Sequence, residues 1–435
     1  MFELPRPNLI GLRPFEDALA ALSERVIDAQ RPIRILNALR WSGRVEEQFA
    51  RARGRELPRP EYDPDLGFDR DAKRAEFDQI LRDIHRELGR SDPLARMLRD
   101  TAEEYRRSVD LLDARGTPRF YEISRELYGS TRDLLPDGRT TVREMGERLG
   151  ATLGAIAWNK IGEPQPREFD ATQAAEILNV RFASFFGESM GVRVDVDDTL
   201  VADAAAGSDY VKIRSGARFS RSDIDILEAH EGWVHLATSL NGQAQPVARW
   251  LAKGPPRTVA VQEGLAVLVE TLTLRSTPRR AKKLNDRVRA VEMAESGADF
   301  LDIYEWYRTA GYEEDECFQN SMRVFRGGTT VGGAPFTKDA SYCTGIVLNQ
   351  AFMHAALTHD RPELIPFLFV GKVAHEDVPH LHARVADGLV RPPPFLPAIF
   401  REMHALAVWL CHASFFATLQ AGDIVEHYAE SMRRG

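Results

Sequence analysis

Residues 228–235, Glu228-Ala229-His230-Glu231-Gly232-Trp233-Val234-His235, are the most informative segment of this chain of 435 residues. Two histidines flank a glutamate that directly follows the first of them. Neutral imidazole is a good zinc ligand, and an adjacent carboxylate can take a proton from water held by a metal. The segment therefore predicts a metal site with His230 and His235 as ligands and Glu231 as the catalytic base.

The spacing of the two histidines differs from the common zinc-peptidase motif. That motif places its histidines at positions i and i+4 so that both face one ion, whereas here they stand at i and i+5. On an ideal helix, five steps of about 100° put the second side chain roughly 140° from the first. A π-bulge would restore a common face, and Gly232 makes that distortion easier. On spacing alone, two helical histidines with ordinary hydrogen bonds are an equal alternative.

A third ligand is expected from another element, because catalytic zinc normally has three protein ligands and one open position. Gln262-Glu263-Gly264-Leu265-Ala266 opens the next apolar helix and places Glu263 among apolar neighbours. An unpaired carboxylate there is costly to bury, and metal ligation supplies a cation. Exposure to solvent or a pair with an arginine is the alternative for Glu263. Glu270, on roughly the same face, either orients a histidine or is an ordinary surface acid.

The rest of the chain predicts an α+β protein that is predominantly α, with a zinc-peptidase core and a small β-sheet. Apolar residues at helical spacing predict a helical N-terminal region over residues 1–170, and residues 171–435 are expected to form the metallopeptidase catalytic domain. Alternating patterns predict strands within 190–200 and 210–220. Because the second strand directly precedes the metal helix, it is expected to offer its edge to an extended peptide.

Three helices after residue 220 are predicted with boundaries. Ser222, followed three residues later by an acid, resembles a capping box and predicts the metal helix from about residue 223 to 239, ending before the turn signal Asn241-Gly242. Residues 258–274 predict a second apolar helix. The apolar run at residues 400–420 predicts a last, buried packing helix.

Composition narrows the class of protein. Hydrophobic residues make up 43% and charged residues 28%, which is the balance of a folded, water-soluble protein, and the net charge of −8 argues against a nucleic-acid binder. No apolar run approaches the ~20 residues that span a bilayer, and no secretory signal is evident. Three scattered cysteines exclude a disulfide framework. We therefore expect a cytoplasmic protein with neither nucleic acid nor membrane as a partner.

The motifs in combination resemble a known family. HEGWVH (230–235), QEGLA (262–266) and RVFRGG…GG…FTKD…Y (323–342) are similar to the QEGLA-motif proteins, whose bacterial members are named as modulators of flavohaemoglobin expression. They also resemble the catalytic part of the microtubule-associated tyrosine carboxypeptidases of animals. The resemblance covers most of the chain and is strongest from about residue 185 to 350.

The resemblance implies a zinc metallopeptidase of the HExxxH type that removes a C-terminal aromatic residue, tubulin being the animal substrate. Carried over by position, one Zn2+ per chain is held by His230, His235 and Glu263, and Glu231 is the base. A peptide or protein C-terminus is the expected substrate, and its identity is not carried over.

Further residues are candidates for binding the substrate. The oxyanion of a tetrahedral intermediate needs a donor beside the metal, and Tyr342 is the first candidate, with aromatic packing as its alternative role. A carboxypeptidase also needs a cation for the terminal carboxylate of its substrate. Arg323, Arg326 and Lys338 cluster in the third motif and are the candidates, with a surface salt bridge as the alternative for each.

Two other functions stay open at this stage. The chain could be a non-catalytic regulatory protein with a structural metal, or a zinc hydrolase of a non-peptide amide. Structural zinc usually has four protein ligands, often cysteines, and neither HEGWVH nor QEGLA supplies a fourth. A count of ligands around the site therefore separates the first alternative from an enzyme.

Overall fold

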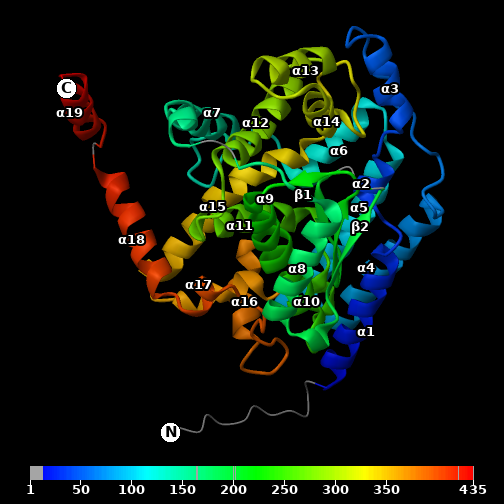
Figure 1. Cartoon of the computed structure of the whole chain (residues 1–435). Helices are drawn as coiled ribbons and strands as arrows, with labels where there is room; N and C mark the ends of the chain where they lie inside the picture. Colours follow the sequence, from blue (N-terminus) through cyan, green and yellow to red (C-terminus); the bar gives the residue numbers. More distant parts are fainter. Residues whose placement is uncertain (1–12, 163–164, 199, 201, 420, 435) are drawn as a thin grey trace.

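The computed structural model describes residues 13–162, 165–198, 200, 202–419 and 421–434, and these form mainly helices (Figure 1). The strands form two small sheets, one three-stranded in the order β2-β4-β3 and one two-stranded in the order β1-β5. The predicted α+β, predominantly α class is confirmed. The strands are β1 (Phe169–Asp170), β2 (Arg193–Asp197), β3 (Ala204–Ala206), β4 (Tyr210–Arg214) and β5 (Arg218–Phe219).

The N-terminal part of the chain is helical, as predicted. Asp69 and Asp92 accept hydrogen bonds from the first backbone N–H groups of two long helices, and Gly89, at φ 75°, ends the first of these helices. The helices are α1 (Arg13–Gln30), α2 (Ile35–Ala38), α3 (Gly43–Arg51), α4 (Arg70–Leu88), α5 (Pro93–Asp113), α6 (Pro118–Tyr128) and α7 (Val142–Gly154).

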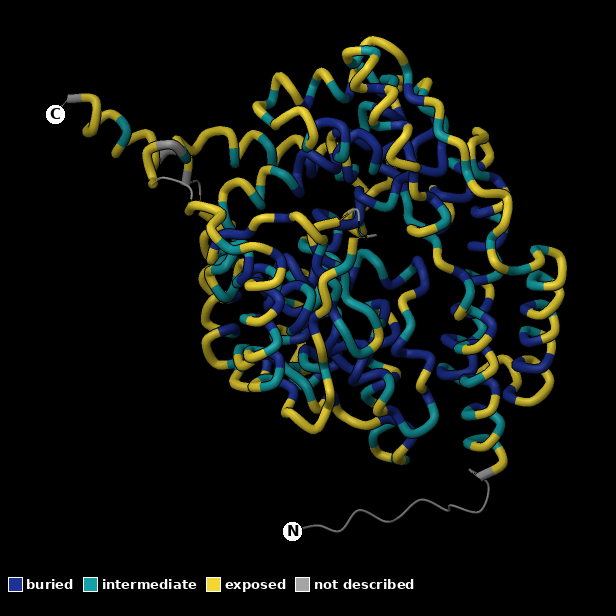
Figure 2. Tube along the Cα trace, turned by 45° about the vertical axis from the view of Figure 1, so that its right-hand side comes forward, coloured by how far each residue is buried: buried dark blue, intermediate teal, exposed yellow. Residues whose placement is uncertain are grey.

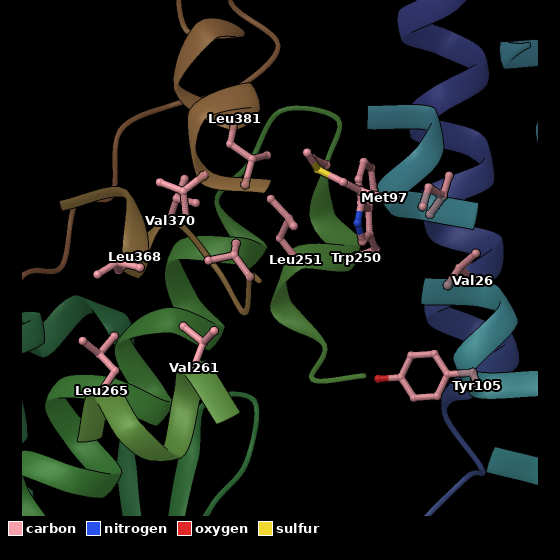
Figure 3. Close-up of a cluster of buried hydrophobic side chains, with 14 of the residues drawn as sticks. Val26, Met97, Tyr105, Trp250, Leu251, Val261, Leu265, Leu368, Val370 and Leu381 are labelled. Atoms are coloured by element: carbon pink, nitrogen blue, oxygen red, sulfur yellow. The ribbon is translucent and has the colours of Figure 1, made fainter. Parts of the chain in front are cut away.

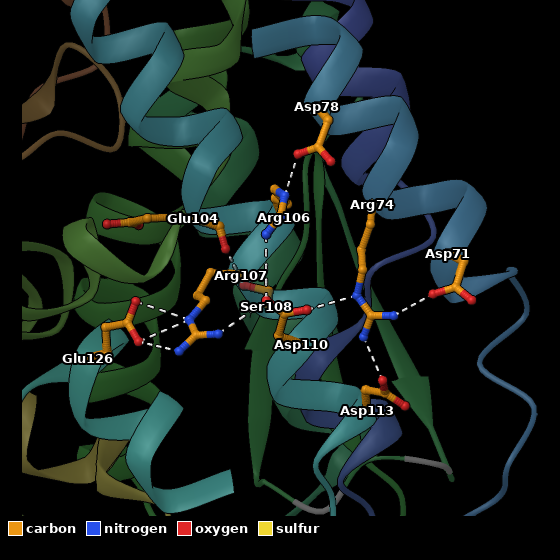
Figure 4. Close-up of polar contacts among 10 residues, drawn as sticks. All are labelled: Asp71, Arg74, Asp78, Glu104, Arg106, Arg107, Ser108, Asp110, Asp113 and Glu126. Carbon is orange, nitrogen blue, oxygen red and sulfur yellow. Dashed lines mark hydrogen bonds and ion pairs between the residues drawn. The ribbon is translucent and has the colours of Figure 1, made fainter. Parts of the chain in front are cut away.

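Ion pairs join the outer faces of α4, α5 and α6 (Figure 4). The guanidinium of Arg74 on α4 donates from Nε to Asp110 on α5 over 2.8 Å. Arg107 on α5 donates from Nε to Glu126 on α6 over 2.9 Å, and a second nitrogen of Arg107 reaches Asp110 over 3.1 Å. Much of the positive charge of this region is therefore neutralised within the fold.

The remaining helices follow α7 along the chain. They are α8 (Ala171–Phe186), α9 (Arg221–Leu227), the π-helix η3 (Glu228–Leu236), α10 (Ala237–Gln243), α11 (Val259–Leu272), α12 (Pro278–Glu295), α13 (Phe300–Thr309), α14 (Glu314–Phe325), α15 (Ser341–Thr358), α16 (Val378–Ala383), α17 (Ala398–Arg401), α18 (His404–Thr418) and α19 (Ala421–Arg434), with short 3-10 turns between several of them. The predicted apolar helix at 258–274 is α11.

The largest hydrophobic core draws side chains from both ends of the chain (Figure 3). Val26 on α1 and Met97 on α5 belong to the same buried cluster as Trp250, Leu265 on α11 and Leu381 on α16. Full burial of side chains of this size stabilises the fold by about 1.5–3 kcal/mol each. The N-terminal helices are thus packed into the core that carries α11. The domain boundary at residue 170 stays a prediction.

The predicted limits of the metal helix were wrong at both ends. Ser220, not Ser222, is the N-cap, and it forms a reciprocal capping box with Asp223. The helical segment also continues through Asn241-Gly242 to Gln243. Tertiary contacts override the turn signal. The Asn241 amide donates to the backbone carbonyls of Phe369 and Phe395. Gly242 packs closely on the backbone of Ala252, from which a Cβ would lie 2.3 Å away.

The prediction that the strand before the metal helix offers a free edge was also wrong. β4 pairs with β2 on one side and with β3 on the other, so it has no free edge for a peptide. β3, which the alternating pattern does not identify, is the edge strand that contacts η3. The predicted strand at 190–200 is present as β2.

The prediction of a buried packing helix at residues 400–420 was wrong. Leu406 and Leu410 are the buried residues of α18, whereas Val408, Phe415 and Phe416 expose more than half of their surface. The helix leads away from the body of the fold and is largely exposed in Figure 2. No described helix is long and apolar enough to cross a membrane.

Candidate metal centre

A π-helix carries the two histidines. η3 spans nine residues and continues directly from α9 and into α10. The π-helix forms i→i+5 hydrogen bonds, so residues five apart share a face. The rings of His230 and His235 accordingly lie with their centroids 4.7 Å apart. The predicted helical distortion is confirmed, although it extends well beyond the single inserted residue expected around Gly232.

Close packing on Gly232 holds this segment in place. A Cβ on Gly232 would lie 2.2 Å from Cε1 of Phe182 on α8, so only glycine allows the phenyl ring to approach this closely. At the start of η3, the Glu228 carboxylate pairs with Arg181 over 2.6 Å and with Arg275 over 2.8 Å. The Arg275 guanidinium lies over the ring of Trp233, 4.3 Å from its centroid. These contacts fix the rotation of the helix that presents the histidines.

The structure brings His230, His235 and Glu263 together. Glu263 Oε2 lies 3.6 Å from Nε2 of His230 and 3.7 Å from Nε2 of His235, and all three ligand atoms lie within 4.8 Å of one another. Two imidazoles and one carboxylate are a donor set that zinc uses in catalytic sites. The residues therefore fit a divalent ion, and the cluster that the described residues form has three ligands, not the four of a structural site.

Lys338 sets the charge of Glu263. Its Nζ donates to Glu263 Oε1 over 2.8 Å, which leaves Oε2 on the side of the histidines. Burial favours the neutral carboxyl, but Lys338 and the two imidazoles outweigh it and hold the pKa of Glu263 well below its usual value. Glu263 is therefore ionised and ready to hold a cation. Lys338, predicted to bind a substrate carboxylate, has this glutamate as its partner.

Glu270 orients His230. The Glu270 carboxylate has an exposed fraction of 0%, and its Oε1 lies 2.6 Å from Nδ1 of His230. Arg280 on α12 donates to both oxygens of Glu270, over 2.9 and 3.1 Å. Burial opposes ionisation of Glu270, but Arg280 and His230 outweigh it and lower its pKa to about 2. Of the two predicted roles, a surface acid was wrong, and the carboxylate fixes the ring so that Nε2 faces Glu263.

Without a metal, the same carboxylates hold a proton on the imidazole. Burial alone would lower the pKa of His230, but its interactions with the Glu263 and Glu270 carboxylates outweigh this and raise the pKa to about 9. A divalent ion would take the place of that proton, because metal-bound imidazole is neutral.

We expect Glu270→Gln to weaken zinc binding by about 10–100-fold, because loss of the negative charge behind a ligating histidine lowers its basicity and frees its ring. Competition with a chromogenic chelator measures the change. Glu316→Gln is the matched control, since Glu316 is a carboxylate that pairs with Arg279 on α12 and does not touch the cluster. Equal zinc affinity in wild type and Glu270→Gln would contradict the orienting role.

Glu231 stands beside the cluster without belonging to it. Its Oε2 accepts a hydrogen bond from the backbone N–H of Ala206 on the edge strand β3 over 2.9 Å. The side chain lines a cavity of about 690 Å³ together with His230 and Tyr342. A cavity of this size holds several atoms of a peptide beside the cluster. The carboxylate is thus available for proton transfer next to a site that fits a metal.

The cavity walls come from distant parts of the chain. Trp41 and Gly43, just before and at the start of α3, line it together with Thr277 and Arg287, just before and on α12. The N-terminal helical region therefore contributes to the cavity as well as to the core.

The other predicted residues have different surroundings. Tyr342 has an exposed fraction of 7% and borders the cavity, with Lys338 Nζ 5.5 Å from its ring centroid. Arg323 also borders the cavity, but Asp339 accepts from two of its nitrogens, each over 2.8 Å. Arg326 is buried over the ring of Phe336 and is not among the described residues that line the cavity. Two of the three predicted cations are thus already paired.

Sequence reasoning missed three features of this site. Arg280 lies ten residues after the carboxylate that it holds, on a different helix, and no motif links the two. The backbone N–H of Ala206 carries no side-chain signal. Lys338 was identified as functional, but its place on Glu263 follows only from the fold.

A histidine pair on one helix, an adjacent glutamate, and a carboxylate from a following helix are a set of residues that fits a metallopeptidase site. A family model described as microtubule-associated tyrosine carboxypeptidase matches residues 47–418, and the chain belongs to this family. The protein is accordingly a carboxypeptidase-like peptidase. The family match begins within α3, so it includes most of the N-terminal helices.

The chain is also distantly similar in structure to a solved protein. Trypanosoma cruzi metallocarboxypeptidase 1 is 12% identical, with a TM-score of 0.40, and the comparison covers 90% of this chain and 98% of that chain. None of the curated proteins compared with the chain matches it.

Proposed function

We propose that this protein is a zinc-dependent carboxypeptidase that removes the last residue of a peptide or protein, with a preference for an aromatic residue. The observation that carries the proposal is the approach of His230, His235 and Glu263 to within 4.8 Å of one another beside a cavity that Glu231 lines. Family membership supports the reaction class. We expect the substrate to be encountered in the cytoplasm.

The proposed mechanism divides the work among residues at known positions. Zinc held by the three ligands would supply a Lewis acid that polarises the substrate carbonyl and acidifies water. Glu231 is the proposed general base, which takes a proton from the attacking water and passes it to the leaving amine. Glu270 holds the tautomer of His230 that leaves Nε2 free to ligate. Tyr342 is the proposed donor to the oxyanion.

The edge strand β3 is the proposed guide for the substrate backbone. β3 runs beside η3 and is tied to Glu231 through Ala206. An extended peptide that adds to a sheet edge is held by main-chain hydrogen bonds, so many sequences bind equally well. The selectivity of the enzyme would then lie at the terminal residue.

A peptide mixture read by mass spectrometry tests the proposal. We expect purified protein to release single residues from free C-termini, to lose this activity on treatment with a zinc chelator, and to regain it when zinc is restored. The reason is that a chelator removes the divalent ion that the two imidazoles and the carboxylate would hold. Cleavage at internal bonds, or activity unchanged by the chelator, would refute the proposed function.

A further inference from the structure

Arg287 occupies an unusual position for an arginine. It lies on α12, has an exposed fraction of 9%, and lines the same cavity as His230, Glu231 and Tyr342. Its guanidinium lies over the ring of Tyr342, 5.1 Å from the centroid. A buried cation thus borders the proposed reaction site.

Arg287 forms no direct ion pair among the described residues, in contrast to its neighbours on α12, although the Asp339 carboxylate attracts it from a greater distance. Arg280 is paired with Glu270, and Arg279 with Glu316. Among the residues that the structure describes, no carboxylate pairs with Arg287, and its buried Nε has no hydrogen-bond partner. Burial and the nearby Arg323 outweigh the attraction of Asp339 and lower the pKa of Arg287. An unpaired buried charge is costly, so this position is explained when an anion from outside the chain completes it.

We propose that Arg287 binds the terminal carboxylate of the substrate. This inference rests on the proposed carboxypeptidase function and assigns the anion subsite to a residue outside the three motifs. A guanidinium fork matches the two oxygens of a carboxylate.

The surroundings of Tyr342 connect this subsite to the metal centre. The ring has Arg287 at 5.1 Å and Lys338 at 5.5 Å, and Lys338 holds Glu263. The anion subsite therefore adjoins the cluster through a single aromatic ring. A chain end bound there would lie beside the cluster, as the removal of one terminal residue at a time requires.

The three cations that the sequence suggested for this role do not combine burial, a place in the cavity wall and the absence of a direct ion pair. Arg323 reaches the cavity, but its Nε and one of its Nη atoms donate to the two oxygens of Asp339. Lys338 engages Glu263. Arg326 is buried without an ion pair among the described residues, yet it does not line the cavity.

Binding of a minimal probe tests the assignment without requiring turnover. N-acetyl-tyrosine and its amide, N-acetyl-tyrosinamide, differ in the carboxylate alone, and calorimetry on the zinc-loaded full chain compares them. We expect wild type to prefer the acid by at least about 10-fold, the preference to vanish in Arg287→Gln, and Arg287→Lys to restore part of it. Arg279→Gln, on the same helix and in the same cavity, is the matched control and should keep the preference. An acid preference that survives in Arg287→Gln overturns the proposal.

Thermal unfolding separates ligand binding from a structural role. Because Arg287 is buried and unpaired, Arg287→Met should raise the melting temperature of the ligand-free protein by roughly 2 °C. An arginine that serves the fold would lower it instead. N-acetyl-tyrosine should stabilise wild type and leave Arg287→Met unchanged. A fall in melting temperature together with equal stabilisation of both proteins by the probe would contradict the proposal.

Kinetics distinguish a failure of the subsite from a failure of the proposed function. On peptides with free C-termini, Arg287→Gln should raise KM by about 100-fold and alter kcat less. If wild type and Arg287→Gln cleave with the same KM, the peptidase stands and the subsite fails. If wild type cleaves no peptide while acid binding still depends on Arg287, the subsite stands and the proposed function fails.

Discussion

Glu231→Gln is expected to lower peptide turnover by about 10²–10⁴-fold while the protein keeps its zinc. The side chain lies outside the three-ligand cluster, so its loss of charge removes no ligand. A glutamine oxygen still accepts the N–H of Ala206, so the contact between η3 and β3 is retained. What disappears is the ability to take a proton from water. Turnover of a C-terminal peptide and zinc content by elemental analysis measure the two effects separately.

Glu316→Gln serves as the control for this experiment, because it removes a cavity-lining carboxylate that is paired with Arg279. Wild-type turnover in Glu231→Gln would show that another group is the base. Loss of zinc from the same variant would show that Glu231 is a ligand.

Gly264→Ala is expected to destabilise the protein by about 1–3 kcal/mol and to weaken zinc binding. Gly264 lies at a close crossing of α11 and α15, where an added Cβ would fall 2.0 Å from the backbone carbonyl carbon of Gly345. Backbone atoms have no alternative rotamer, so the two helices must separate. Glu263 is the preceding residue and Tyr342 lies at the start of α15, so the movement displaces both. Denaturant unfolding and chelator competition provide the measurements.

Gly154→Ala is the matched control, because Gly154 ends α7 and nothing lies within 4 Å of a Cβ there. Replacement of a helical glycine by alanine at an open position is neutral or stabilising. If Gly264→Ala unfolds at the same denaturant concentration as wild type, the crossing tolerates a wider separation than the structure indicates.

The proximity of His230, His235 and Glu263 was predictable because these residues are chemically distinctive. His230, Glu231 and His235 lie within six positions, and the spacing of five between the two histidines itself predicted a distorted helix. Glu263 was identified because an acid in an apolar run requires a partner. The sequence therefore contained both the donors and the reason why they must converge.

The rest of the site was not predictable because it depends on contacts between distant segments. Three consecutive alanines have no strand signal, yet β3 forms the edge that contacts Glu231, because β4 supplies its pairing partners. Asn241-Gly242 is a turn signal in isolation, but the backbone carbonyls of Phe369 and Phe395 recruit the asparagine and keep the helix intact. The pairing of each cation, and hence the isolation of Arg287, is likewise set by packing between helices.

The widened turn of η3 also bears on how related proteins are found. A search keyed to histidines four positions apart passes over this chain, although its two imidazoles face the same carboxylate. A motif with a fixed spacing assumes the number of residues per turn of an α-helix, and the π-helix η3 has more residues per turn. Other proteins whose two histidines have a spacing different from four can therefore be compared again. The comparison should use the positions of the ligand atoms in the structure, with a π-helix allowed between the two histidines.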